Sequence, residues 1–128
     1  MYGTTSNTLW AIDQVNGDTA SVGNNYPVKG MNALVGHGDE LQGAAADEIY
    51  NINGITAKVT DYKAIGYASA GALAWDGKTL YESVILGNED ALFNVTKDYV
   101  VNDLRSPSGG YLNDVFGLAS SGSAMYAV

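Results

Sequence analysis

The segment Thr8-Leu9-Trp10-Ala11-Ile12-Asp13 decides the fold, because related segments occur at two later places in the chain. The counterparts are Glu48-Ile49-Tyr50-Asn51-Ile52-Asn53 and Ala91-Leu92-Phe93-Asn94-Val95-Thr96. Each copy has an aliphatic, an aromatic, a small and a β-branched residue, followed by a short polar residue that favours a turn. This alternation predicts the same β-strand three times along the chain.

A second element also occurs three times, in residues 33–41, 72–80 and 117–125. Its copies share a glycine where a hairpin turn is expected, at Gly38, Gly77 and Gly122. This element recurs after 39 and then 45 residues, and the first element after 40 and then 43 residues. Repeats of about 40–45 residues with four short strands each are typical of β-propeller blades.

The repeats predict an all-β chain built from three four-stranded blades. Two blades are continuous, in residues 31–70 and 71–114, and the third is split between residues 115–128 and 1–30. If the two ends are joined, Leu118 and Leu34 are 44 residues apart, so the repeat closes on itself. This closure favours a complete set of three units over a fragment of a longer propeller.

Three blades do not close a ring, because propellers normally have four to eight. An open arc exposes apolar faces and unpaired strand edges, which favour aggregation. We therefore expect a homodimer that forms a six-bladed ring. Residues 115–128 of one chain would pair with residues 8–23 of the other at both junctions.

Two stretches resemble PQQ-like and related bacterial propellers. Residues 9–19, LWAIDQVNGDT, are similar to the strand pair LYAIDxxTGxxT of these proteins. Residues 71–81, GALAWDGKTLY, resemble their GLAFDGxTLY hairpin, as does Phe116-Gly117-Leu118-Ala119. The resemblance is a repeat pattern over nearly the whole chain and implies a propeller fold. The tryptophan-docking residues of true quinoproteins are absent, so it implies no PQQ and we expect no cofactor.

Composition limits the classes of partner. Of 128 residues 46% are hydrophobic, enough for a core, and the net charge of −8 speaks against binding nucleic acid or anionic membranes. The absence of cysteine excludes disulfides, thiolate metal sites and cysteine nucleophiles. The first residues lack a basic and apolar leader, and no apolar run reaches the roughly 18 residues of a membrane helix. We expect a soluble chain without a signal peptide.

His37 is the only histidine and lies in Gly36-His37-Gly38-Asp39-Glu40. It aligns with the turn residues Asp76 and Ser121, so we interpret it as part of a hairpin turn. The alternative is a general base or metal ligand beside the neighbouring carboxylates. The acidic pairs at 39–40, 47–48 and 89–90 lack the spacing of a calcium loop and are interpreted as loop charge, with no metal site.

The aromatic residues at one repeat position, Trp10, Tyr50 and Phe93, are expected to pack between neighbouring sheets. The alternative is a ring of side chains that stack on sugars. The segments that join the last strand of one blade to the first strand of the next each combine tyrosine with a cation. The candidate binding residues in these segments are Tyr26, Lys29, Tyr62, Lys63, Tyr67, Arg105 and Tyr111.

Tyrosine supplies stacking and a hydroxyl, and a cation supplies charge for an anionic or polyhydroxylated ligand. We therefore predict a binding or scaffold module without catalysis, which takes a small molecule, glycan or protein on this loop face. Polar loops without a ligand are the simpler explanation of the same residues. The alternative function is a hydrolase or lyase with its site at the channel of a six-bladed propeller.

Overall fold

The computed structural model describes residues 1–5, 7–23, 28, 30–37, 40–104, 114–121 and 124–128. The N-terminal sheet of the chain consists of β1 (Tyr2–Thr5), β2 (Thr8–Ile12) and β3 (Thr19–Ser21), in that order. All regular structure in these residues is β-strand, which confirms the predicted all-β class. Within this part of the chain, no helix is long and apolar enough to cross a membrane.

Two four-stranded antiparallel sheets follow. The second sheet has the order β4 (Ala33–His37), β5 (Glu40–Ala45), β6 (Glu48–Asn53) and β7 (Val59–Ala64). The third sheet repeats it with β8 (Ser69–Trp75), β9 (Leu80–Leu86), β10 (Glu89–Val95) and β11 (Val101–Asp103). The chain ends in a hairpin of β12 (Leu118–Ser121) and β13 (Ala124–Ala127).

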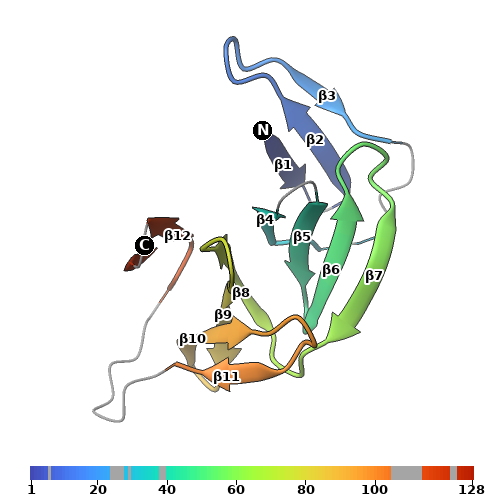
Figure 1. Ribbon diagram of the computed structural model, residues 1–128. Coiled ribbons are helices and arrows are strands. Elements are labelled where there is room, and N and C mark those ends of the chain that lie inside the picture. The colour runs from blue at the N-terminus through green and yellow to red at the C-terminus, as the bar shows by residue number, and fades with distance from the viewer. Residues whose placement is uncertain (6, 24–27, 29, 38–39, 105–113, 122–123) are drawn as a thin grey trace.

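The sheets follow one another in chain order along an arc (Figure 1). The strands β1, β4, β8 and β12 lie toward the inside of the arc, and β3, β7 and β11 lie toward its outside. Along the inside, β4 packs against β8 and β8 packs against β12. Each unit therefore begins beside the first strand of the unit before it.

The turn after each copy of the repeated strand is closed by the polar residue that the sequence places there. The Asp13 carboxylate accepts the N–H of Val15 at 2.7 Å, and the Asn53 side chain accepts the N–H of Ile55 at 3.0 Å. The Thr96 hydroxyl accepts the N–H of Val100 at 3.1 Å. These local bonds stabilise a turn relative to continuation of the extended strand. The predicted turn positions are therefore confirmed.

The second sheet has a core on each of its faces. Leu41 and Ile52 pack with Leu9 of the N-terminal sheet, whereas Ile49 packs with Val84 and Phe93 of the third sheet. Leu9, Ile49 and Ile52 are fully buried. Each such side chain contributes about 1.5–3 kcal/mol by leaving water, so packing between sheets holds the arc together.

The strands β1 and β13 occupy the same position of the repeat. β1 pairs with β2 in the same register as β5 pairs with β6. Likewise, β13 pairs with β12 in the same register as β5 pairs with β4. Gly3 and Ala127 thereby both correspond to Gly43. The sequences agree with this, because Met1-Tyr2 corresponds to Met125-Tyr126. The repeat pattern does not predict the strand β1.

Candidate ligand-binding site

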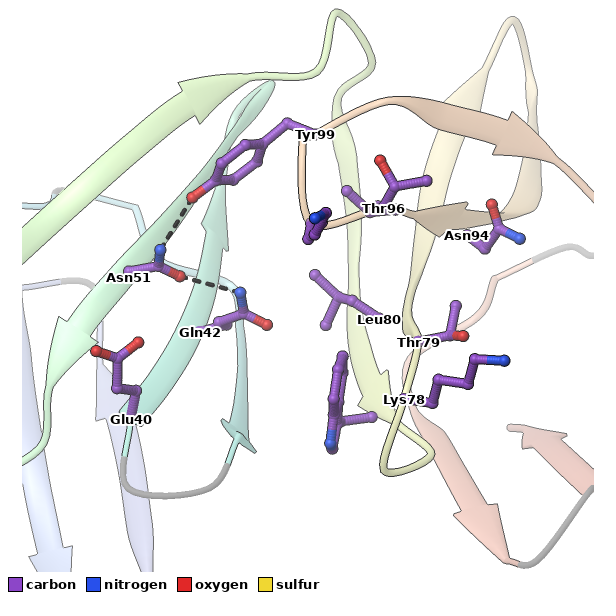
Figure 2. A pocket seen from close by; sticks show the side chains of 12 residues that line it. Glu40, Gln42, Asn51, Lys78, Thr79, Leu80, Asn94, Thr96 and Tyr99 are labelled. Atoms are coloured by element: carbon purple, nitrogen blue, oxygen red, sulfur yellow. Dashed lines mark hydrogen bonds between the residues drawn. The ribbon is translucent and has the colours of Figure 1, made fainter.

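A cavity of about 460 Å³ lies between the second and third sheets (Figure 2). It is found beside the β8–β9 and β10–β11 turns, at the opposite end of the sheets from the connection between β7 and β8. Its volume is within the range of small-molecule sites. The polar and aromatic residues that line it are Glu40, Gln42, Asn51, Trp75, Lys78, Thr79, Asn94, Thr96, Lys97 and Tyr99, with Leu80 and Val95 between them.

A chain of side-chain hydrogen bonds runs along the wall formed by the second sheet (Figure 2). Gln42 Nε2 donates to Asn51 Oδ1 at 3.0 Å, and Asn51 Nδ2 donates to Tyr99 Oη at 2.9 Å. Tyr99 Oη donates in turn to Asp61 Oδ2 at 3.3 Å. A carboxylate only accepts hydrogen bonds, so Asp61 sets the direction of every bond in the chain.

With this direction, the hydrogen-bond chain ends at Gln42 with an acceptor that has no donor. Because Gln42 uses its amide nitrogen toward Asn51, its Oε1 atom remains as an acceptor. That oxygen is buried and has no hydrogen-bond partner among the described residues. A buried acceptor without a partner costs about 1–3 kcal/mol, so the wall contains a polar group that a donor would stabilise.

Tyr99 is held at the cavity in a backbone conformation that side chains rarely adopt. Its φ is 61°, in the left-handed region, and the residues that close the matching turns are Gly17 and Ala57. This conformation costs a bulky residue about 1 kcal/mol or more. Burial, with the nearby Asp61 carboxylate, raises the pKa of the Tyr99 hydroxyl. The hydroxyl therefore remains a donor to Asp61 at neutral pH.

The opposite wall is set by the β8–β9 turn. The Asp76 carboxylate accepts the backbone N–H groups of Thr79 at 2.7 Å and Lys78 at 2.8 Å. These bonds lower the pKa of Asp76 and position the two side chains that follow it. Farther along, Asn94 also lines the cavity, and its Oδ1 accepts from Asn102 Nδ2 at 2.8 Å.

Two of the predicted binding residues, Tyr62 and Lys63, belong to β7 rather than to a loop. The Tyr62 ring stacks on Tyr50, with 5.6 Å between centroids, and Lys63 Nζ lies 5.8 Å from the centroid of Tyr99. The Tyr50 hydroxyl donates to Glu48, and burial raises the pKa of Tyr50 to about 12. Lys63 therefore lies beside a residue of the cavity, while Tyr62 lies against another tyrosine.

Tyr67 packs edge-on against Phe93, with 4.7 Å between ring centroids, as part of the core between the second and third sheets. Phe93 is 2% exposed, as expected for packing between sheets. The other predicted binding residues, Tyr26, Lys29, Arg105 and Tyr111, lie outside the described residues, and their role remains a prediction.

His37 is the last residue of β4 and pairs with Glu40 of β5, so it belongs to a strand beside the expected turn. Among the described residues, no group of three or more His, Asp or Glu side chains is placed to hold a metal ion.

The carboxylic acid of Glu82 is buried inside the fold. Glu82 of β9 is 1% exposed in the core, its Oε2 has no partner in the described part of the chain, and burial raises its pKa to about 8.

The repeat pattern does not mark the cavity residues Gln42, Asn51 and Tyr99, because they come from two different strands and a turn. One signal in the sequence could have indicated Tyr99: it is a bulky residue in a turn whose equivalents in the other two repeats have the small residues Gly17 and Ala57.

The chain matches no model of a known protein family, and no curated protein is significantly similar to it.

Proposed function

We propose that the chain is a non-catalytic ligand-binding module whose site is the cavity between the second and third sheets. The observation that supports this most directly is the hydrogen-bond chain from Gln42 to Asp61, which ends in a buried acceptor without a partner. Buried polar groups are normally satisfied, and exceptions often mark functional positions. The strained backbone of Tyr99 at the same place supports the proposal further.

A thermal-shift screen of small molecules against the wild-type protein and Gln42→Leu tests this site. Leucine is apolar and one carbon shorter than glutamine, so it removes the open acceptor and the donor to Asn51 without adding a polar group. We expect at least one ligand class to raise the melting temperature of the wild type and to have less effect on the variant. A screen without any hit, or hits that act equally on both proteins, would contradict the proposal.

We further propose that the sheets are propeller blades and that two chains form a six-bladed ring. Support comes from the arc of repeated sheets and from the packing of β4, β8 and β12 in succession along its inside. Pairing of residues 115–128 with residues 8–23 of a second chain would place β13 where β1 lies, because both correspond to β5. Strand exchange of this kind replaces β1 by its equivalent.

Light scattering at several protein concentrations tests the assembly. We expect the mass to rise to twice 13.4 kDa as the protein concentration increases, and to stay at the monomer value when residues 123–128 are removed. A folded monomer at every concentration would refute the ring. The predicted loop face around Tyr26, Lys29, Arg105 and Tyr111, and the alternative of a hydrolase or lyase, remain predictions beside this proposal.

A further inference from the structure

We propose that the cavity binds a neutral polyhydroxylated molecule, such as one sugar ring of a glycan. This inference rests on the proposed function, since it names the ligand class of the same site. It depends on three features of the cavity wall: an acceptor that needs a donor, polar side chains on the third-sheet side, and a tryptophan.

The acceptor at Gln42 requires a ligand that donates a hydrogen bond. Hydroxyl groups donate and accept, whereas a fully ionised phosphate or carboxylate only accepts. The Gln42 oxygen is closed to water in this structure, and Figure 2 shows it on the side of the amide toward Leu80, where a ligand hydroxyl would meet it without disturbing the bond to Asn51. The new bond extends a chain of donors that all point toward Asp61, and hydrogen bonds in such a chain polarise one another.

The wall of the third sheet offers complementary groups. The Asn94 amide nitrogen and the Lys78 ammonium group are donors, and the Thr79 hydroxyl is both donor and acceptor. Glu40 provides a carboxylate on the second-sheet side. The cavity is therefore lined by donors and acceptors and by side chains of both charge signs, which matches the hydroxyl groups of a sugar better than a ligand of one charge.

Trp75 lines the same cavity, and its side chain is half-buried. An indole ring provides a large flat apolar surface, on which the C–H groups of a sugar ring can pack while the hydroxyl groups point to the polar walls. A small number of polar groups beside an aromatic surface is the usual composition of a specific small-molecule site.

Trp75 also provides the measurement. The chain has one other tryptophan, Trp10 of β2, and Phe93 takes its place in another copy of the repeat, so Trp10→Phe should fold and leave Trp75 as the only indole. This variant is titrated with glucose, galactose, mannose, maltose and lactose while tryptophan emission is recorded. Glucose 6-phosphate and a mixed library of nucleotides and short peptides are titrated in parallel.

We expect a saturable change in emission with at least one neutral sugar. Gln42→Leu in the same background should weaken it about tenfold, equivalent to about 1.4 kcal/mol. The matched control is Gln14→Leu, at an exposed position of the β2–β3 turn, and it should bind as tightly as the parent. Should Gln42→Leu not fold, Asn94→Ala replaces it and should also reduce the affinity severalfold.

The outcomes separate this inference from the proposed function. Binding of glucose 6-phosphate or of library members, with no neutral sugar bound, overturns the sugar assignment but leaves a ligand-binding cavity. Absence of any response overturns both. Sugar binding that is equally strong in Gln42→Leu and Gln14→Leu overturns the assignment to this cavity.

Discussion

Glu82 is a carboxylic acid enclosed in the core between the second and third sheets, and Glu82→Gln should change how stability depends on pH. Its side chain is 1% exposed, between the strand neighbours Leu73 and Phe93, and its Oε2 lacks a partner among the described residues. Burial disfavours the charged form and raises the pKa to about 8, although a hydrogen bond with Ser69 acts in the opposite direction.

The raised pKa determines the sign and size of the effect. Between the ordinary value of 4.5 and about 8, the folded protein keeps a proton that the unfolded chain has released. The free energy of unfolding therefore falls as pH rises through this window, and the stabilisation present below pH 4.5 is lost above pH 8. Each pH unit inside the window costs at most about 1.4 kcal/mol, and the whole window about 5 kcal/mol. Total stabilities are only about 5–15 kcal/mol, so this one group has a large effect.

Urea unfolding of the wild type and Glu82→Gln between pH 5 and 9 measures the effect. The variant has no proton to lose, so its stability should fall by several kcal/mol less than that of the wild type over this range. Asp98→Asn removes one charge from an exposed turn and controls for the change in net charge, and it should follow the wild-type curve. Parallel curves for wild type and Glu82→Gln would refute the reasoning.

Three further changes test other parts of the fold. Asp76→Ala should lower the melting temperature because the β8–β9 turn loses two bonds to backbone N–H groups, whereas Asp76→Asn should retain most of it. Gly23→Ala should cost over 2 kcal/mol in urea unfolding, because its φ is 65° and a Cβ would overlap the Thr56 carbonyl oxygen. Gly17→Ala, with φ 80° and open space around it, should cost only about 1 kcal/mol. Tyr99→Phe should cost about 0.5–1.5 kcal/mol by removing the hydroxyl from the Gln42 hydrogen-bond chain, and a melting curve unchanged from wild type would contradict this.

The strands and turns were predictable because their causes are local. Asp13, Asn53 and Thr96 end equivalent strands with side chains that accept backbone N–H groups, and this chemistry is visible in the sequence. The Asp76-Gly77 turn was predictable for the same reason, because the Asp76 carboxylate accepts the backbone N–H groups of Lys78 and Thr79.

The candidate site was not predictable because it depends on how two sheets face each other. Gln42 and Tyr99 are 57 positions apart, and their connection through Asn51 exists only after the third sheet packs on the second. The tyrosines of the expected loop face were selected by type, but Tyr67 is part of the core. Residue type alone does not distinguish a tyrosine that packs from one that binds.

If two chains assemble as proposed, the equivalence of β1 and β13 makes the two strands compete for the same edge of β2. Only two residues separate β1 from β2 in the chain, so the effective concentration of β1 at the β2 edge is on the order of millimolar. The β13 strand of a second chain at micromolar concentration would compete at about a thousandfold disadvantage. Association through this edge should therefore begin only at high local concentration, or when residues 1–5 are removed. In the proposed ring, the N-terminal strand would therefore inhibit the strand exchange that forms the dimer.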